Sequence, residues 1–229
     1  MFWILIIGIA VASWLVQWNL KRKFAKYSHM PLGNGMTGKD VAELMLRENG
    51  IQDVQVRSTS GMLTDHYNPA NKTINLSEGV YSTSNVAAAA VAAHETGHAL
   101  QHANAYSPLK IRSALVPTVN FSSQWVSWLL LGGMILLGNG SHVGWTILAI
   151  GVGLYGMITL FSFITLPVEI NASQRALAWL NRTGITNSYN DGAARDALKA
   201  AAYTYVVAAI GSLVTFLYYL LILFGGRRN

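Results

Sequence analysis

The sequence predicts a mainly α-helical integral membrane protein with about four transmembrane helices and a small membrane-proximal α+β domain. Three observations support this fold class. Hydrophobic residues make up 52% of the 229 residues and charged residues only 11%, whereas soluble domains carry about 25% charged residues. Residues 2–20 and 113–168 contain no Lys, Arg, Asp or Glu. Between them, residues 28–84 alternate short apolar and polar runs bounded by glycine and proline, which is typical of strands and turns.

Residues 2–20 form the first predicted transmembrane helix. The stretch is long enough to span a bilayer, and Lys21, Arg22 and Lys23 follow it directly. A secretory signal places its positive charge before the apolar run and small residues after it. We therefore expect a membrane anchor here.

The uncharged stretch 113–168 predicts a hairpin of two transmembrane helices, at about 121–137 and 143–163. Glycine, asparagine and serine at 138–141 break the stretch near its middle. A hairpin returns the chain to the side of the membrane that it left, so the segments before and after it face the same compartment. Close contact between these helices is expected at their glycines, which are Gly132, Gly133, Gly151, Gly153 and Gly156.

These segments define the predicted domain organisation. Residues 1–20 are the first transmembrane helix, 121–165 the hairpin, and 201–226 a fourth transmembrane helix that Arg227 and Arg228 follow. Residues 21–120 and 166–200 are then the two parts of one domain outside the lipid.

The first part of this domain is expected to contain a helix, a sheet and a second helix. A short amphipathic helix begins at Thr37 or Gly38 and ends at Asn49. Three strands are predicted at 54–56, 62–67 and 73–76, and we expect them to form a small antiparallel sheet. A longer helix follows from about residue 86 to 104, with an N-cap among residues 82–85.

The longer helix carries the sequence His94-Glu95-Thr96-Gly97-His98, which has the pattern H-E-x-x-H. On a helix, positions i and i+4 lie on one face, so both imidazoles can reach one metal ion. Glu95 lies beside them, where it can act as a general base on a metal-bound water. The flanking residues are Ala, Val and Leu, whereas a chance match on a surface helix would have polar flanks. The pattern indicates one catalytic zinc ion per chain, with His94 and His98 as ligands.

Two residues compete for the role of third ligand. His102 is one turn beyond His98, but it lies about 12 Å along the helix axis from His94. Zinc–nitrogen bonds of about 2 Å do not reach across that span. Glu169 stands among apolar residues where the chain leaves the hairpin, and binding a cation would offset the cost of burying its carboxylate. We therefore expect Glu169 as the ligand. A simple ion pair between Glu169 and Arg175 is the alternative.

The composition excludes one class of metal site and one class of partner. The chain has no cysteine, which excludes a thiolate metal site. The formal net charge is +6, but the basic residues flank apolar segments, so we interpret them as determinants of membrane orientation and expect no nucleic-acid partner. Their distribution predicts that the face with the H-E-x-x-H helix is cytoplasmic and that both termini are outside.

The sequence resembles the bacterial membrane-anchored neutral zinc metallopeptidases, the YugP-like membrane proteases. The matching segments are 61–69 (GMLTDHYNP), 92–103 (AAHETGHALQHA), 108–117 (PLKIRSALVP), 166–169 (LPVE), 172–173 (AS) and 175–180 (RALAWL). Together with the apolar segments they cover nearly the whole chain. The resemblance implies zinc-dependent peptide hydrolysis at the bacterial inner membrane.

A more distant similarity is to the membrane zinc proteases of the heat-shock and prenyl-protein-processing type. Their third ligand is the Glu of an E-x-x-A-D sequence, and residues 169–173 here read E-I-N-A-S. The similarity therefore implies Glu169 as ligand. Ser173 stands where an Asp is expected, so a hydroxyl is the candidate partner for a zinc-bound histidine.

The expected function is a membrane-embedded zinc endopeptidase that cleaves membrane-associated or misfolded proteins. An extended substrate would pair with an edge strand near Thr64 and Asp65, although the strands could equally serve only to cap the zinc helix. His66, Tyr67 and Arg175 are the candidates for stabilising the transition state. The alternative function is a proteolytically silent scaffold or chaperone with a structural metal, but such a site needs no general base. The sequence identifies neither a homo-oligomer nor a regulatory membrane partner.

Overall fold

The computed structural model describes residues 2–225, which fall into two compact units. Of the described residues, the first unit comprises 2–12, 110–166 and 205–225, and the second comprises 13–109 and 167–204. Arg227 and Arg228, predicted to follow the last transmembrane helix, lie outside the described residues. The prediction of a mainly α-helical protein with a short sheet is confirmed.

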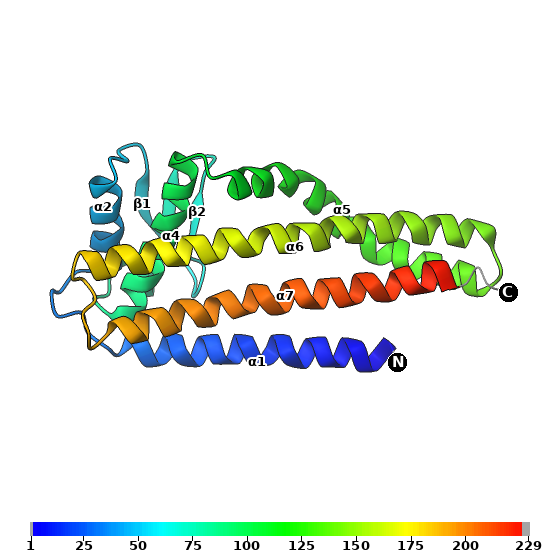
Figure 1. Cartoon of the computed structure of the whole chain (residues 1–229), viewed down its shortest axis with the longest axis horizontal. Helices are drawn as coiled ribbons and strands as arrows, with labels where there is room; N and C mark the ends of the chain where they lie inside the picture. The colour runs from blue at the N-terminus through cyan, green and yellow to red at the C-terminus, as the bar shows by residue number, and fades with distance from the viewer. Residues whose placement is uncertain (1, 226–229) are drawn as a thin grey trace. The chain divides into compact units, whose positions relative to one another are not determined.

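Four helices are long and apolar enough to span a membrane (Figure 1). They are α1 (Phe2–Ser28), α5 (Ser107–Gly138), α6 (His142–Arg182) and α7 (Asp191–Gly225). Over the residues that the structure describes, each predicted span lies on one of these helices, but every helix extends beyond its apolar part. The extra turns are polar, so hydropathy alone does not detect them.

Small residues allow the helices of the first unit to approach closely. A Cβ atom on Gly133 would lie 2.6 Å from the backbone nitrogen of Leu148, and one on Gly151 would lie 3.1 Å from the Leu130 side chain. Gly156 instead packs against Phe216 of α7, outside the predicted hairpin. The predicted close contact is wrong for Gly132 and Gly153, where a Cβ atom would have no neighbour within 4 Å among the described residues. Both of these glycines lie on helix faces away from the contact.

Helix α6 runs through Pro167 without ending. Proline is common at the first position of a helix, but Pro167 lies inside α6. Proline removes one main-chain hydrogen bond, but the helix continues for 15 residues, from 168 to 182. This continuation places Glu169 and Ser173 on the same helix as the preceding apolar segment.

The second unit contains two further helices with defined N-caps. Helix α2 (Gly38–Glu48) begins with a capping box between Thr37 and Asp40, and α4 (Val86–Ala103) is capped by the side chain of Asn85. Both agree with the predicted bounds. A short helix, α3 (Glu78–Tyr81), precedes α4 and was not predicted. It has only four residues, too few for a periodic pattern.

The sheet of this unit is mixed rather than antiparallel. Its strands β1 (Gln55–Thr59), β2 (His66–Asn68) and β3 (Thr73–Ser77) have the order β1-β3-β2. The β2–β3 pair is an antiparallel hairpin, but β1 pairs in parallel with the other edge of β3. The prediction of an antiparallel sheet is therefore wrong for β1. Residues 60–65 carry the chain across β3, a crossover that strand patterns do not specify.

The predicted second strand, 62–67, is also too long. Gly61 and Leu63 have positive φ angles of 99° and 58°, which are incompatible with an extended strand. Pairing therefore begins only at His66.

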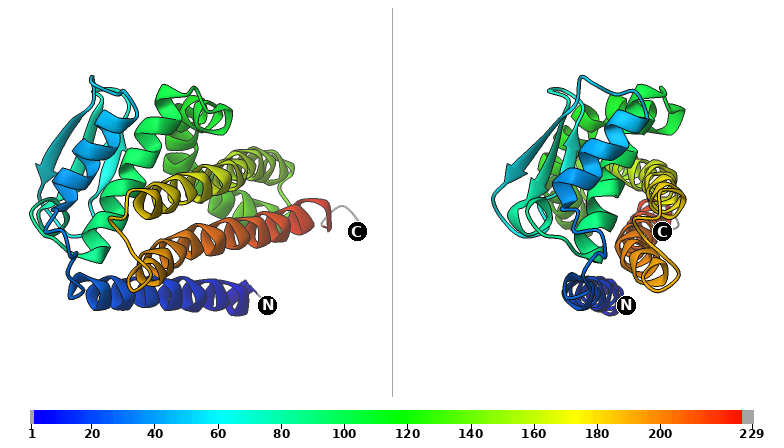
Figure 2. Two further views of the ribbon diagram at one scale, coloured as in Figure 1. Left: turned by 60° about the vertical axis from the view of Figure 1, so that its left-hand side comes forward. Right: turned by 90° about the vertical axis from the view of Figure 1, so that its left-hand side faces the viewer.

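Helix α4 lies between the sheet and the C-terminal part of α6 (Figure 2). Its alanine-rich first half is buried on all sides, with Ala87 to Ala90 at most 1% exposed. Other contacts join the helices of this unit at their polar ends. Trp179 of α6 donates to Glu48 of α2, and Asp196 of α7 accepts from Lys23 and Tyr27 of α1 at 2.6 and 2.5 Å. Asp196 is thus half-buried in an ion pair with Lys23.

Candidate metal centre

His94, His98 and Glu169 lie together in the second unit. The Nε2 atoms of His94 and His98 are 3.3 and 3.5 Å from the same carboxylate oxygen, Oε2 of Glu169. One potential ligand atom from each residue lies within 4.8 Å of the others. The two histidines come from successive turns of α4, and Glu169 comes from α6, as the sequence indicated.

Gly97 makes this meeting of helices possible. A Cβ atom on Gly97 would lie 2.7 Å from the carbonyl oxygen of Ala172 and 3.2 Å from its Cα, distances that are too short for any side chain. Because the backbone of α6 touches α4 between the two histidines, Glu169 comes within reach of both. Gly97 therefore serves the close packing of α4 against α6.

The cluster is buried and its charges are coupled. Glu169 is only 2% exposed. Burial by itself lowers the pKa of His98, but the hydrogen bond and charge of Glu169, together with the charge of Glu95, outweigh it, so that the pKa of His98 is raised. A metal ion that binds the imidazole has to displace this proton. Metal binding is therefore expected to release protons and to weaken as the pH falls.

The second nitrogen of each imidazole has its own hydrogen-bond partner. Nδ1 of His94 lies 3.0 Å from the hydroxyl of Ser173, the residue that the sequence suggested for this role. Nδ1 of His98 lies 3.0 Å from Oε1 of Gln101. Histidines that bind metals usually engage their other nitrogen in this way, which orients the ring. Both rings here present Nε2 to Glu169.

Glu95 is oriented by the sheet. Its Oε2 accepts a hydrogen bond of 2.9 Å from the backbone N–H of Tyr67 in β2, and its side chain is buried. Because β2 is an edge strand and Tyr67 directs its N–H away from β3, the bond leaves the sheet ladder intact. The carboxylate of Glu95 is therefore held on the flank of the histidine pair without being one of the three clustered ligands.

The separations between the Glu169 carboxylate oxygen and the two imidazoles fit zinc. Two ligand atoms bound at about 2.0–2.1 Å to one tetrahedral zinc ion lie about 3.3–3.4 Å apart. The two nitrogen–oxygen separations, 3.3 and 3.5 Å, are close to this value. Two imidazoles and one carboxylate leave one position open, which is typical of catalytic rather than structural zinc sites.

His102 does not join the cluster. Its Nδ1 lies 2.9 Å from the hydroxyl of Tyr67, and the two rings are in contact. Burial and the charge of Asp53 raise the pKa of Tyr67, so its hydroxyl keeps its proton. The expectation that helix geometry separates His102 from the other two histidines agrees with this placement.

Three predicted substrate or transition-state residues have local partners. Asp65 accepts hydrogen bonds from the backbone N–H and hydroxyl of Ser77, which fixes the start of β2 against the end of β3. Thr64 donates to the carbonyl of Ser60. His66 lies between the Thr64 carbonyl, 2.8 Å from Nδ1, and the amide of Asn75. These contacts give Asp65 a structural role and do not place Thr64 or His66 in the metal cluster.

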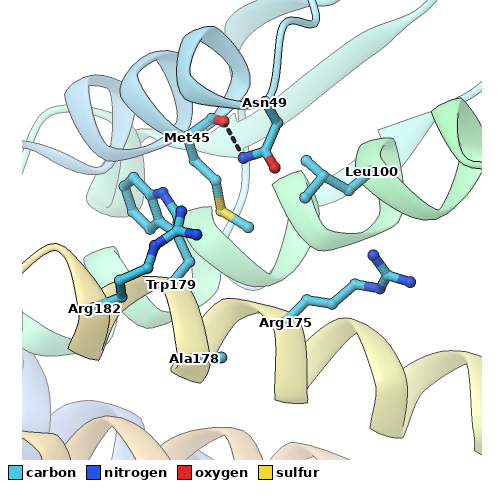
Figure 3. Close-up of a pocket in the computed structure, with 7 residues that line it drawn as sticks. All are labelled: Met45, Asn49, Leu100, Arg175, Ala178, Trp179 and Arg182. Atoms are coloured by element: carbon cyan, nitrogen blue, oxygen red, sulfur yellow. Dashed lines mark hydrogen bonds between the residues drawn. The ribbon is translucent and has the colours of Figure 1, made fainter.

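Arg175 lies on α6 beside Asn171, and its Nε donates to Oδ1 of that residue at 2.7 Å. Figure 3 shows Arg175 at one end of a pocket of about 230 Å³, with Arg182 towards the other. Met45, Leu100 and Trp179 supply most of its apolar lining, which comes from α2, α4 and α6. Gln101 and Asn171, which link this pocket to His98, were not identified from the sequence.

Comparison with known proteins agrees with a zinc-binding role for this site. Residues 2–224 match the model of a family described as "Putative neutral zinc metallopeptidase". The chain belongs to this family of zinc metallopeptidases. The resemblance seen in the sequence is thereby confirmed.

A relative of this chain occurs in Bacillus subtilis (strain 168), where it is called "Putative membrane protease YugP". The two sequences are 40% identical over 227 residues, which cover 99% of this chain and 98% of the relative. Together with the four apolar helices of the described residues, this similarity indicates that the chain is membrane-associated. No solved structure matches the chain.

Proposed function

We propose that this metallopeptidase is a membrane-embedded zinc endopeptidase of the His-His-Glu type, with one zinc ion per chain. The observation that carries this proposal is the cluster of His94, His98 and Glu169, with Glu95 oriented beside it. A structural zinc site usually fills all four positions with protein ligands and needs no general base. The cluster has three ligands and a flanking carboxylate, which favours catalysis.

Each residue of the site has its own proposed role in peptide hydrolysis. A zinc ion held by His94, His98 and Glu169 would polarise a peptide carbonyl and lower the pKa of a water molecule. Glu95 would accept a proton from that water and pass it to the amine of the leaving peptide. The N–H of Tyr67 keeps the Glu95 carboxylate in one orientation, and the hydroxyl of Ser173 and the amide of Gln101 orient the two imidazoles.

The proposed substrates are exposed loops or tails of membrane-associated or misfolded proteins. Glu169 is the second residue after Pro167, on the same helix as a long apolar segment, which favours an active site near the bilayer surface. Strand β2 is an edge strand that contacts Glu95 through Tyr67. An extended peptide that lay along this edge would pass close to the general base, but the N–H of Tyr67 is bonded to Glu95 and is not free to pair with it.

Chelation tests the enzymatic activity directly. Purified protein is expected to contain one zinc per chain and to cleave an unfolded substrate such as casein. Removing the metal with a chelator should abolish cleavage, and adding zinc back should restore it. Bound zinc without any cleavage of membrane or soluble substrates would instead support the silent scaffold, and absence of bound zinc would contradict the metal site.

The proposed location is the bacterial inner membrane, with the metal site facing the cytoplasm. Ten Lys and Arg residues lie between Lys21 and Arg112 and four between Arg175 and Lys199, all on the side of α4 in a four-span topology. Only Arg227 and Arg228 fall on the opposite side in that topology. Lysine and arginine are enriched in cytoplasmic loops, so their distribution favours a cytoplasmic α4.

Cysteine labelling tests this orientation, because the natural chain has no cysteine. In intact cells, a membrane-impermeant thiol reagent should label Asn229→Cys and leave Lys72→Cys unlabelled. Permeabilised cells provide the control, in which both variants react. Labelling of Lys72→Cys in intact cells would reverse the proposed topology.

A further inference from the structure

Gln101 is fully buried between α4 and α6, and both polar atoms of its amide are engaged. Its Oε1 lies 3.0 Å from Nδ1 of His98. Its Nε2 donates to the carbonyl oxygen of Val168 at 2.8 Å and to Oδ1 of Asn171 at 3.0 Å. The same Asn171 oxygen accepts a hydrogen bond from Nε of Arg175 at 2.7 Å. Three bonds thus connect Arg175, on the rim of the pocket in Figure 3, to His98.

The direction of each bond in this chain follows from the chemistry of its members. An arginine side chain has only donors, so the atom of Asn171 that meets Arg175 has to be its oxygen. That oxygen and the carbonyl of Val168 are both acceptors, so the group of Gln101 that faces them has to be its NH₂. The remaining atom of the Gln101 amide, which faces His98, is therefore the oxygen. The amide orientations do not depend on an arbitrary choice between nitrogen and oxygen.

The directions of these hydrogen bonds determine which nitrogen of His98 carries the hydrogen. An amide oxygen only accepts hydrogen bonds, so Nδ1 of His98 has to be the donor. In a neutral imidazole the other nitrogen then carries the lone pair. Nε2 of His98 is the atom that faces Glu169, 3.5 Å from its carboxylate oxygen. His98 is therefore prepared to bind a metal ion through Nε2.

We propose that Arg175, Asn171 and Gln101 form a positioning relay that fixes the tautomer and ring orientation of His98 for zinc binding. The proposal rests on the metal site proposed above and assigns roles to residues that do not touch the metal. It also assigns Arg175 a positioning role, through the bond from its Nε to Asn171.

The hydrogen-bond partner of His94 differs from that of His98, so the relay selects the tautomer of His98 alone. Nδ1 of His94 meets the hydroxyl of Ser173, and a hydroxyl can donate or accept. Ser173 therefore orients the His94 ring without dictating its tautomer. Of the two histidines, His98 is the one whose metal-binding atom is selected by its surroundings.

The experiment measures zinc affinity by competition with a chromogenic chelator in one detergent. Gln101→Leu removes the acceptor for His98 at nearly constant volume and is expected to weaken zinc binding about 10- to 100-fold, the usual effect of losing such a partner. Arg175→Met leaves Gln101 in place but frees Asn171 to rotate, so a smaller loss in the same direction is expected.

Arg182→Met is the matched control, since Arg182 lines the same pocket on the same helix but pairs with Glu48 of α2. Its zinc affinity should equal that of the natural protein. The visible absorption bands of the cobalt-loaded proteins give a second readout. They should shift in Gln101→Leu and Arg175→Met, because the ligand field at His98 changes, and should stay unchanged in Arg182→Met.

The outcomes distinguish failure of the proposed relay from failure of the proposed metal site. If the natural protein binds no zinc, the proposed metal site fails. If the natural protein binds zinc and Arg175→Met matches Arg182→Met in affinity and spectrum, the relay is overturned. This comparison stands even if Gln101→Leu does not fold, because Arg175 lies at the edge of the pocket rather than in the buried core.

Discussion

Replacing Glu95 with glutamine is expected to reduce peptide cleavage by about 10²- to 10⁴-fold, the range typical for loss of a general base. Glutamine has the same shape, and its amide oxygen can still accept the hydrogen bond from Tyr67 N–H that orients Glu95. It cannot accept a proton from water. Because Glu95 is not among the clustered ligands, zinc content should remain near one per chain. Cleavage rates and metal content are to be measured on the same preparation.

Two results would count against this role for Glu95. Natural levels of cleavage in Glu95→Gln would exclude it as the base. Loss of zinc in the same variant would show that Glu95 supports the metal instead. Glu78→Gln is a suitable control, because Glu78 is an acid of the same unit that belongs to α3 and not to the cluster.

Replacing Glu169 with glutamine is expected to remove most of the bound zinc. The carboxylate is the anionic member of the cluster, and its Oε2 lies within 3.5 Å of both imidazoles. A neutral amide binds zinc poorly and leaves the buried cation without a compensating charge. Metal content after dialysis against a weak chelator measures the effect, with the natural protein treated in parallel.

His102→Ala is the matched variant for this experiment. His102 lies on the same helix as His94 and His98 but bonds the hydroxyl of Tyr67. The variant should therefore retain stoichiometric zinc. If His102→Ala lost its zinc while Glu169→Gln kept it, the assignment of the third ligand would be wrong.

The sequence predicted those features that are determined by residues close together in the chain. The apolar segments locate the four long helices, Thr37 and Asn85 mark helix starts, and the spacing of His94 and His98 defines their shared face. Glu169 was identifiable because a lone carboxylate in an apolar segment needs a cation. Its role as a ligand stays a prediction, but the structure does bring it to the two histidines.

The features that sequence reasoning missed depend on contacts between distant segments. The parallel pairing of β1 with β3 arises from the crossover at 60–65, and strand patterns do not encode pairing partners. Gln101 bonds Val168 and Asn171, 67 and 70 positions away. One local signal existed: Gln101 is three residues after His98, on the same helix face. A buried amide at that spacing is a candidate partner for a histidine ligand.

The charge of the hydrogen-bond partners of the two imidazoles also affects which ion the cluster can bind. Ser173 and Gln101 are uncharged, so the buried carboxylates at the cluster are Glu95 and Glu169. Their two negative charges sum to zero with one divalent cation. A sodium or potassium ion would leave a net negative charge in a medium of low polarity, where an uncompensated charge is strongly unfavourable. Electroneutrality therefore favours a divalent over a monovalent ion at this cluster, and an aspartate in place of Ser173 would shift that balance by one unit.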